Sequence, residues 1–311
     1  MHYTLFHHYS IPSLLLGTVQ LGMDYGIANV HGHPSEAEAH QLLAAARVKG
    51  ITALDTSPTY GTSEAVIGSY LQTHPSADFC VISKFKYTTT LPFSLEKAWQ
   101  ETKVSVQQSL ANLGIAKLPI ALYHKAGTET MDHVKAVVPV LIDRLKNENL
   151  IEHGGISLYY SAEANELLDD TYFEALQIPM NVLDQEIILN GTLEKLHTQG
   201  KLITIRSVFL QGLFWKNPDE IQGNLRIALP YLQKLNVLAQ TYQLSMAELT
   251  FGFIRDLEAV DSLVIGAETQ AQLDHNIQLL NGPQLPIELR RQLAALSQQV
   301  PLELITPGLW K

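Results

Sequence analysis

Short apolar segments alternate with longer amphipathic segments along most of the chain. Eight of the apolar segments are rich in Val, Ile or Leu, which is typical of strands that are covered on both faces of a sheet. We predict strands at residues 13–17, 51–55, 79–84, 120–124, 153–157, 176–180, 202–207 and 262–266.

The amphipathic segments between these strands predict helices. Ser35 and Glu38 have the spacing of a capping box, and Gly50 supplies a stop signal for the helix that follows Ser35. Ser94 precedes a second amphipathic run, which continues to Leu113. We expect further helices over residues 131–147, 161–169, 192–199, 222–243 and 269–280.

Repeated alternation of strand and helix predicts parallel strands joined by crossover helices, an α/β fold. Eight such units in roughly 250 residues match the size of a (β/α)8 TIM barrel. An open doubly wound sheet is the alternative, but it usually carries G-x-G-x-x-G after its first strand, and the sequence has no such motif. We expect one domain over residues 1–311, in which residues 1–12 cap the barrel and residues 281–311 form a C-terminal helix and tail.

Composition and charge limit the kinds of molecule that the chain is expected to bind. With 46% hydrophobic and 17% charged residues, the chain is suited to a folded, core-forming protein. The formal charge of 21 − 31 = −10 argues against nucleic acids and anionic membranes as partners. The single cysteine, Cys80, excludes an intrachain disulfide, and we find neither a signal sequence nor a membrane-spanning stretch. We therefore expect a cytoplasmic protein.

Four polar residues follow the ends of three consecutive predicted strands. Asp55 ends the second strand, Tyr60 lies in the loop after it, Lys84 ends the third strand and His124 ends the fourth. Active sites of barrel enzymes lie at this end of the strands. The joint placement of these residues therefore predicts a catalytic site. The alternative is a hydrogen-bond network at the rim that has no catalytic role.

These residue types suit the reduction of a carbonyl group. A tyrosine with a pKa of about 10 holds its proton at neutral pH and can donate it to a developing alkoxide. The ammonium group of Lys84 would lower the pKa of Tyr60, and Asp55 would neutralise Lys84. His124 would donate a hydrogen bond that orients the carbonyl oxygen.

Eight separated segments, from about residue 14 to residue 280, together resemble the aldo-keto reductase superfamily. They are Leu16-Gly17-Thr18; Asp55-Thr56 with Tyr60-Gly61-x-Ser63-Glu64; Ser83-Lys84; His124; Gly154-Gly155-Ile156-Ser157; Gln177 to Asn181; Arg206 to Gly212; and Val264 to Asn276. The resemblance implies Asp55, Tyr60, Lys84 and His124 as a catalytic tetrad. It also implies a nicotinamide cofactor, NADP or NAD.

The resemblance implies that Ser157 and Gln177 bind the nicotinamide carboxamide. Two positions depart from the family pattern: Leu158 stands where Asn often follows that serine, and Arg206 replaces an aromatic residue that commonly stacks on the nicotinamide. The guanidinium of Arg206 could contact a cofactor phosphate or an acidic group of the substrate, or it could pair with a nearby carboxylate.

The loop after the seventh strand and the end of the eighth predict the rest of the cofactor site. Barrel phosphate sites commonly form there. Glu268 would repel the 2′-phosphate of NADP but can accept hydrogen bonds from the ribose of NAD, so we expect weak selection for NADP at most. The residues expected to contact the cofactor are Gly17, Thr18, Asp55, Ser157, Gln177, Arg206, Ser207, Phe209, Gln211, Gly212, Gly266, Glu268, Gln272 and Asn276.

The expected substrate is a small carbonyl compound: an aldehyde, a ketone or a sugar. Gln20 and Tyr25, in the loop after the first strand, would line its site together with Tyr60 and His124. Arg206 and Lys125 favour a polar or acidic substrate over an apolar one. Trp215, Trp310, the tail over residues 300–311, Tyr159 and Tyr160 are further candidates for the pocket wall.

No metal site is expected, because His7, His8, His31 and His33 lack a metal-binding pattern and are better explained as solvated side chains. Two alternative functions remain. One is a non-catalytic, cofactor-binding regulatory subunit, which the changes at Leu158 and Arg206 would favour. The other is a lyase or aldolase that forms a Schiff base at Lys84.

Overall fold

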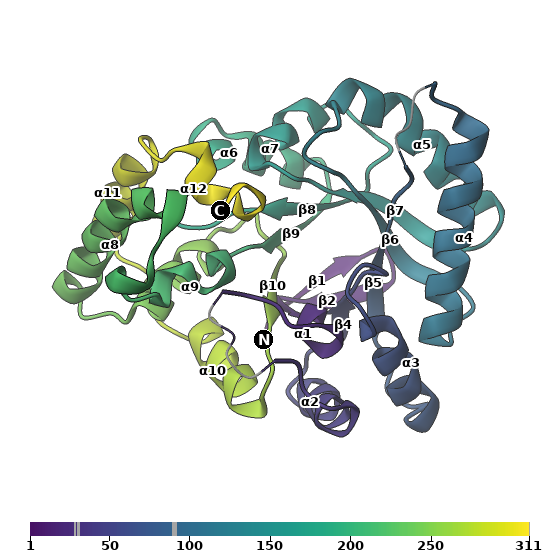
Figure 1. Ribbon diagram of the computed structural model, residues 1–311, viewed down its shortest axis with the longest axis horizontal. Coiled ribbons are helices and arrows are strands. Elements are labelled where there is room, and N and C mark those ends of the chain that lie inside the picture. Colours follow the sequence, from purple (N-terminus) through teal and green to yellow (C-terminus); the bar gives the residue numbers. More distant parts are fainter. Residues whose placement is uncertain (28, 30–31, 89–91, 311) are drawn as a thin grey trace.

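Eight parallel strands close into a barrel in the order β10-β3-β4-β5-β6-β7-β8-β9 (Figure 1). The computed structural model describes residues 1–27, 29, 32–88 and 92–310, so His31 and Lys311 lie outside the described residues. The barrel strands are β3 (Leu14–Gly17), β4 (Ala53–Asp55), β5 (Cys80–Phe85), β6 (Leu118–His124), β7 (Ile151–Ser157), β8 (Ala175–Pro179), β9 (Leu202–Arg206) and β10 (Ser262–Gly266). The predicted (β/α)8 barrel is confirmed.

The register of the strands gathers their last residues at one rim. Gly17 pairs with Asp55 between β3 and β4, and His124 pairs with Ser157 between β6 and β7. Ser157 in turn pairs with Gln177 on β8. Since parallel strands in such a register end side by side, polar side chains from separate strands converge there.

The helices lie outside the barrel (Figure 1). They are α2 (Glu36–Val48), α3 (Ser63–Thr73), α4 (Leu95–Leu113), α5 (Met131–Asn147), α7 (Thr192–Thr198), α8 (Leu229–Thr241), α9 (Met246–Arg255), α10 (Gln270–Leu280) and α11 (Ile287–Ser297), with short helices α1 (Val19–Gly22), α6 (Glu186–Leu189) and α12 (Leu302–Ile305). The predicted capping box at Ser35 and Glu38 is present.

Apart from the short helices α1 and α6, which were not predicted, the helix predictions were incomplete in four places. Helices α3 and α9 were not predicted: most of their residues are buried, so neither shows a clear polar face, and Gly68 further weakens the helical pattern of α3. The helix expected at 161–169 is a 3-10 helix, η1 (Ser161–Leu167). The helix expected at 222–243 is divided into the 3-10 helix η4 (Gly223–Ala228) and α8.

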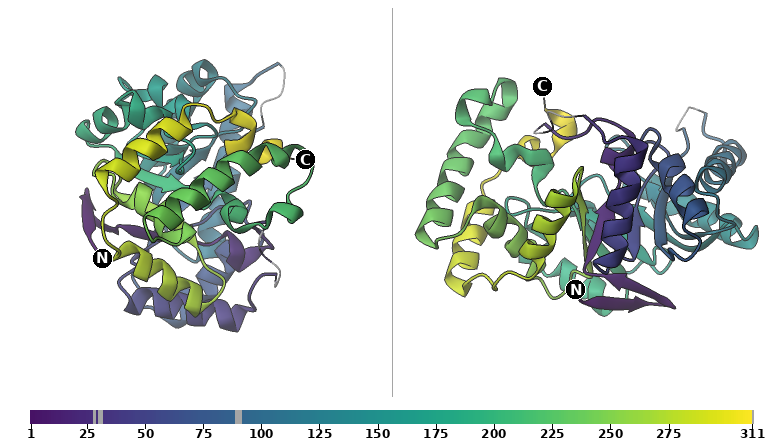
Figure 2. Two further views of the ribbon diagram at one scale, coloured as in Figure 1. Left: turned by 90° about the vertical axis from the view of Figure 1, so that its left-hand side faces the viewer. Right: turned by 90° about the horizontal axis from the view of Figure 1, so that it is seen from below.

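The first twelve residues form an antiparallel hairpin of β1 (Tyr3–Phe6) and β2 (Tyr9–Pro12). Its Phe6 and Ile11 pack in one apolar cluster with the interior residues Leu15, Ile120 and Leu202 of the barrel. The hairpin and the C-terminal tail lie on opposite sides of the barrel (Figure 2, right). Its connection is His7-His8 rather than one of the Asn-Gly or Asp-Gly pairs that usually mark such turns.

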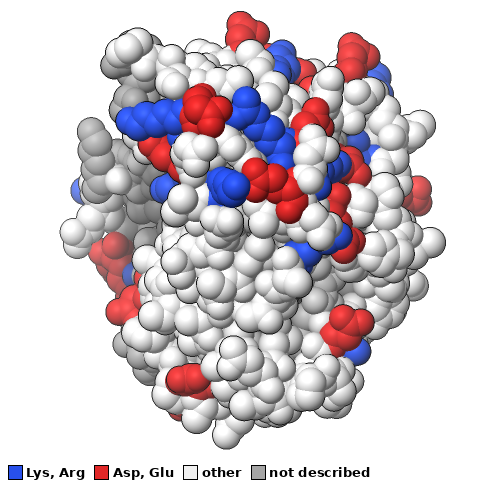
Figure 3. All heavy atoms as spheres, turned by 90° about the vertical axis from the view of Figure 1, so that its right-hand side faces the viewer, with Lys and Arg blue, Asp and Glu red and all other residues white. Residues whose placement is uncertain are grey.

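On the molecular face in Figure 3, Lys and Arg side chains lie among Asp and Glu side chains. Ion pairs of the protein surface include Lys103 with Glu148 and Arg144 with Glu96. Within the described parts of the chain, every helix is too short or too polar to cross a lipid bilayer.

Close packing of α3 against α4 gives a test of the fold. A Cβ atom on Gly68 would lie 2.0 Å from the main-chain oxygen of Asn112, whereas one on Gly252 in α9 would meet the side chains of Leu285 and Arg255 at 3.2 and 3.3 Å. We expect Gly68→Ala to lower the free energy of unfolding by about 1–3 kcal/mol through overpacking. Gly252→Ala, with the same gain in helix propensity of about 1 kcal/mol, should change it little or raise it. Urea unfolding of both variants measures the difference, and equal effects would contradict the packing argument.

Candidate active site

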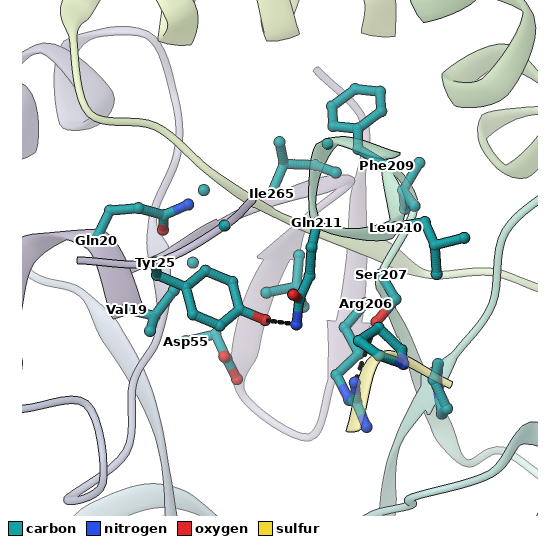
Figure 4. Close-up of a pocket in the computed structure, with 18 of the residues that line it drawn as sticks. Val19, Gln20, Tyr25, Asp55, Arg206, Ser207, Phe209, Leu210, Gln211 and Ile265 are labelled. Atoms are coloured by element: carbon teal, nitrogen blue, oxygen red, sulfur yellow. Dashed lines mark hydrogen bonds between the residues drawn. The ribbon is translucent and has the colours of Figure 1, made fainter. Parts of the chain in front are cut away.

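A cavity of about 690 Å³ opens at the rim formed by the C-terminal ends of the strands. Tyr25 and Gln211 reach toward each other within it, and Gln20, Asp55 and Arg206 approach from separate elements (Figure 4). Most of the predicted site residues line it: Gly17, Thr18, Gln20, Tyr25, Asp55, Tyr60, His124, Arg206, Ser207, Phe209, Gln211, Gly212, Gly266, Glu268, Gln272 and Asn276.

Asp55, in the wall of the cavity, forms a buried ion pair with Lys84. The ammonium group of Lys84 donates to both carboxylate oxygens of Asp55 at 2.8 Å and to the main-chain oxygen of Thr56 at 2.9 Å. Asp55 is 2% exposed and Lys84 is 1% exposed. Burial disfavours the charged form of Lys84, but Asp55 and then Tyr60 outweigh it, so the pKa of Lys84 is raised. Lys84 therefore stays protonated.

Ser157 and Gln177 lie behind this ion pair and not in the wall of the cavity. The Gln177 amide donates to the second carboxylate oxygen of Asp55 at 2.6 Å, and the Ser157 hydroxyl donates to the Gln177 carbonyl oxygen at 3.1 Å. The two residues expected to hold the nicotinamide carboxamide thus support Asp55 in this structure.

Tyr60 is held by a tight loop between β4 and α3. Gly61 adopts a φ of 57°, and a Cβ atom there would lie 2.2 Å from the main-chain oxygen of Gly22. The backbone N–H of Thr62 also donates to Gly22 at 3.2 Å. A side chain at position 61 would therefore clash with Gly22, which restricts the course of the loop. The centroid of the Tyr60 ring lies 5.1 Å from the Lys84 ammonium.

Burial is the main influence on the acidity of Tyr60. It raises the pKa of Tyr60 above its usual value, while Lys84 and Arg206 act in the opposite direction. The net direction differs from the lowering that the neighbouring ammonium alone predicts, because the cost of burying a phenolate exceeds the attraction to Lys84. Tyr60 therefore keeps its proton at neutral pH.

His124 is neutral in this environment. Burial, followed by the positive charges of Lys84, Arg206 and Lys86, lowers the pKa of His124 to about 3. A neutral imidazole carries one N–H donor and one acceptor nitrogen. It can therefore donate a hydrogen bond in the cavity without adding a further positive charge.

Arg206 contacts neutral groups. Its guanidinium donates to the main-chain oxygen of Leu158 at 2.9 Å and to the Ser207 hydroxyl at 3.1 Å. Its Nε atom, and the Oε1 atom of Gln20 in the same cavity, are buried without a hydrogen-bond partner among the described residues. Buried polar atoms usually have partners, so each of these atoms is an unsatisfied donor or acceptor, and the two lie on separate sides of the cavity (Figure 4).

The loop after β9 has a strained backbone. Ser207, Leu210 and Gln211 adopt φ values of 65°, 46° and 55°, and Gly212 follows with 91°. A left-handed backbone conformation costs free energy for any residue other than glycine, and it persists where surrounding contacts hold the backbone in place. Here the main-chain oxygen of Gln211 accepts from the N–H of Ile27 at 3.1 Å, and the Gln211 amide donates to the Tyr25 hydroxyl at 3.1 Å.

The end of β10 supplies the far wall of the cavity. The N–H of Glu268 donates to the Gln272 side-chain oxygen at 2.7 Å, and the Thr269 hydroxyl caps α10. His275, beside Asn276 on α10, also lines the cavity and was not predicted. His275 follows Gln272 by three residues and so lies on the same face of the helix, and this spacing could have identified it from the sequence.

Further wall residues come from distant parts of the chain. Trp215, Tyr159 and the tail over residues 305–308 line the cavity, whereas Trp310 donates instead to the main chain of Glu303 and Leu304. Lys125 also lines the cavity, and its ammonium group pairs with Glu163 at 2.6 Å. Tyr160 does not belong to the wall.

Comparison with known proteins agrees with this geometry. A model of the Aldo/keto reductase family matches residues 13–298. The chain is 22% identical over 297 residues to a D-threo-aldose 1-dehydrogenase of a Pseudomonas species, which covers 86% of this chain and 88% of the relative. It is 23% identical over 259 residues to an NADH-specific methylglyoxal reductase of Escherichia coli K12, which covers 75% and 79%.

Among solved structures, the holo form of the aldo-keto reductase AKR11C1 from Bacillus halodurans superposes with a TM-score of 0.77. Its sequence is 19% identical, and the match covers 97% of this chain and 98% of that one. This likeness supports the barrel fold.

The buried ion pair predicts an asymmetric response to mutation. Asp55→Asn leaves the Lys84 charge without its counter-ion, so we expect the free energy of unfolding to fall by about 3–5 kcal/mol. The double variant Asp55→Asn/Lys84→Met should recover much of this loss, because it removes the uncompensated charge. Urea unfolding measures both.

The control for this prediction is Glu148→Gln, which breaks a half-exposed ion pair with Lys103. It should cost no more than about 1 kcal/mol. If the single Asp55→Asn variant is as stable as this control, the buried Asp55–Lys84 pair contributes no more to the free energy of unfolding than an exposed pair does.

Proposed function

The chain belongs to the aldo/keto reductase family, and from that premise we propose that it is an NAD(P)H-dependent oxidoreductase that interconverts a carbonyl compound and an alcohol. One observation carries the proposal. Asp55, Tyr60, Lys84 and His124, which lie on three different strand–loop units, meet at one rim around a cavity large enough for a ligand.

Each of these four residues has a defined role in the proposed reaction. When bound, a reduced nicotinamide would supply the hydride for the carbonyl carbon. The neutral imidazole of His124 donates a hydrogen bond to the carbonyl oxygen and orients it. The Tyr60 hydroxyl donates its proton to that oxygen, and the nearby Lys84 charge stabilises the phenolate that remains. Asp55 holds the Lys84 ammonium in place.

The cavity has features that fit a nicotinamide dinucleotide. The buried Nε of Arg206 and Oε1 of Gln20 offer a donor and an acceptor that have no partner among the described residues. The loop over residues 207–212 and the N-terminus of α10 lie along one wall, where backbone N–H groups and a helix dipole favour a pyrophosphate. We infer that these elements hold the phosphates and that Asn276 lies on the adenine side.

We further infer that NAD(H) is accepted at least as well as NADP(H). Glu268 lines the cavity at the end of β10, and its carboxylate would repel a 2′-phosphate while accepting hydrogen bonds from a ribose. The relative from Escherichia coli is named for NADH specificity. The residues of α10 that line the cavity within the described chain are Gln272, His275 and Asn276, so this helix offers neither Lys nor Arg to a 2′-phosphate.

The charges of the cavity favour a small polar substrate. Arg206 lies in the wall together with Tyr25 and Tyr159, so hydroxyl or carboxylate groups of a substrate would find donors there, whereas the buried ammonium of Lys125 is already paired with Glu163. The two relatives are named for an aldose and for methylglyoxal, both small and polar. We propose hydroxylated or dicarbonyl compounds of this size as the substrate class.

The geometry disfavours a Schiff-base lyase. Attack on a carbonyl carbon requires a neutral amine. The Lys84 ammonium donates to Asp55 and to Thr56, and its pKa is raised. It is therefore suited to remain a cation.

Replacement of Tyr60 tests the proton donor. We expect Tyr60→Phe to lower kcat/KM for carbonyl reduction by about 10²–10⁴-fold, the usual contribution of a general acid. Binding of the nucleotide should stay within roughly twofold, because the hydroxyl acts on the substrate oxygen. Steady-state assays with methylglyoxal and several aldoses, combined with nucleotide titration, measure both quantities.

The matched control is Tyr25→Phe, which removes a hydroxyl in the same cavity that contacts Gln211 and not the ion pair. It should cost less than about tenfold in kcat/KM. Nearly full activity of Tyr60→Phe would overturn the assignment. Nucleotide binding by the unaltered chain without turnover of any substrate would favour a regulatory subunit instead.

A charge reversal tests the choice of nucleotide. In the unaltered chain, quenching of Trp215 fluorescence should show NADH binding at least as tightly as NADPH. Glu268→Lys should tighten NADPH by about tenfold or more, which corresponds to roughly 1.4 kcal/mol. Glu258→Lys makes the same charge change on an exposed residue that precedes β10 and lies outside the cavity wall, and it should leave both affinities unchanged. A preference for NADPH in the unaltered chain would contradict the role given to Glu268.

A further inference from the structure

Three histidines and two glutamates gather at the end of the barrel opposite the active site. His7 and His8 form the turn of the hairpin. Glu152 and His153 lie near the start of β7, and Glu174 directly precedes β8. These residues come from three segments that are far apart in the sequence, so the fold itself brings them together.

Two imidazoles of this cluster converge on one carboxylate oxygen. His7 Nε2 lies 3.0 Å from Glu174 Oε2, and His153 Nδ1 lies 2.9 Å from the same oxygen. The two rings are stacked, with centroids 3.9 Å apart and an angle of 16° between their planes. Both ring nitrogens therefore point at a common place beside Glu174.

The spacing of these three atoms suits a small divalent cation. Zn²⁺ binds imidazole nitrogen and carboxylate oxygen at about 2.0–2.2 Å, so two ligands of a tetrahedral ion lie roughly 3.4 Å apart. The ligand atoms of His7, His153 and Glu174 all lie within 4.8 Å of one another. Small side-chain movements would bring them to coordination distance.

A second group of ligands borders the first. His8 Nε2 lies 3.4 Å from Glu152 Oε2, and His153 lies within 4.8 Å of both. The His7 group is the better formed of the two, since its distances to the carboxylate are shorter and Glu152 already accepts a hydrogen bond from Tyr9 at 2.8 Å.

We propose that His7, His153 and Glu174 form a binding site for a divalent transition metal, Zn²⁺ in the first instance, that fastens the hairpin to β7 and β8. Two neutral imidazoles and one carboxylate leave a position open for water or for a neighbouring ligand. Lys146 pairs with the other oxygen of Glu174, Oε1, which leaves Oε2 toward the imidazoles. The Lys146 charge weakens the attraction for a cation at this site.

The backbone of the turn sets the direction of the His7 side chain. His7 adopts a φ of 52°, a left-handed conformation in which Asn, Asp and His are several-fold enriched among residues other than Gly. This turn places its ring face to face with that of His153. The side chains of His7, His153 and Glu174 are 49%, 13% and 22% exposed, so an ion from solution can reach them.

The proposed site is independent of the proposed enzyme function. His153 and Glu174 lie near the N-terminal ends of β7 and β8, whereas Ser157 is the last residue of β7 and Gln177 is the middle residue of β8. Binding at the hairpin therefore leaves the catalytic rim unchanged, and metal binding can be tested without any enzymatic assay.

The test is calorimetric titration of the full-length, untagged and chelator-treated protein with ZnCl2, together with thermal unfolding. We expect one Zn²⁺ per chain and a melting temperature that rises by a few degrees in excess metal. His7→Asn should weaken binding by at least about tenfold and abolish the rise. Since Asn tolerates a positive φ, this variant should melt without metal at the same temperature as the unaltered chain or higher.

His33→Asn is the matched control, because His33 is exposed and pairs with a single carboxylate, Asp24, at 2.8 Å. It should bind Zn²⁺ like the unaltered chain. Should His7→Asn melt lower without metal, Glu174→Gln, which keeps the shape of the side chain, replaces it as the test. The proposal is overturned if the unaltered chain binds no Zn²⁺ below about 1 mM, or if His7→Asn and Glu174→Gln bind it undiminished. Loss of binding in His8→Asn but not in His7→Asn would overturn the assigned ligand set.

Discussion

The open end of the barrel depends on the buried ion pair between Asp55 and Lys84. Taking both charges out of water costs several kcal/mol each, and only complete pairing and hydrogen bonding offset that cost. The structure meets this requirement with neighbours from four strand–loop units: Thr56 beside β4, Lys84 on β5, Ser157 on β7 and Gln177 on β8. Closure of the barrel therefore helps to offset the cost of burying these charges, because an open sheet would not bring β8 back to β4.

The sequence predicted those parts of the site that depend on the register alone. Asp55 and His124 are the last residues of β4 and β6, and Lys84 is the second to last of β5. A strand ending in a polar residue is visible in the pattern, and a parallel barrel places such residues at one rim. The position of Tyr60 is different, since it depends on Gly22 and Gly61 fitting against each other, which is a contact between two loops.

Other features could not be predicted from the hydrophobic pattern of the sequence, for similar reasons. The tail over residues 305–308 and Tyr159 reach the cavity through contacts between distant segments, which no local periodicity encodes. Helix α9 is buried on nearly all sides, so it lacks the polar face by which a surface helix is identified. The net effect on the pKa of Tyr60 could not be read from the sequence either, because the neighbouring charge was visible and the depth of burial was not.

The electrostatics of the cavity contrast with those of the whole molecule. A chain with a net charge of −10 places Lys84, Arg206 and Lys86 close enough to His124 to help lower its pKa to about 3. Of these, Lys84 is matched by a carboxylate, whereas Arg206 donates to neutral oxygens. Because Glu268 also lines the cavity, the positive charge is local to Arg206, near His124, and it favours an anionic group there rather than throughout the cavity. Burial is the main cause of the lowered pKa of His124, and the neighbouring positive charges add to it, so His124 is neutral and can donate a single hydrogen bond to a ligand.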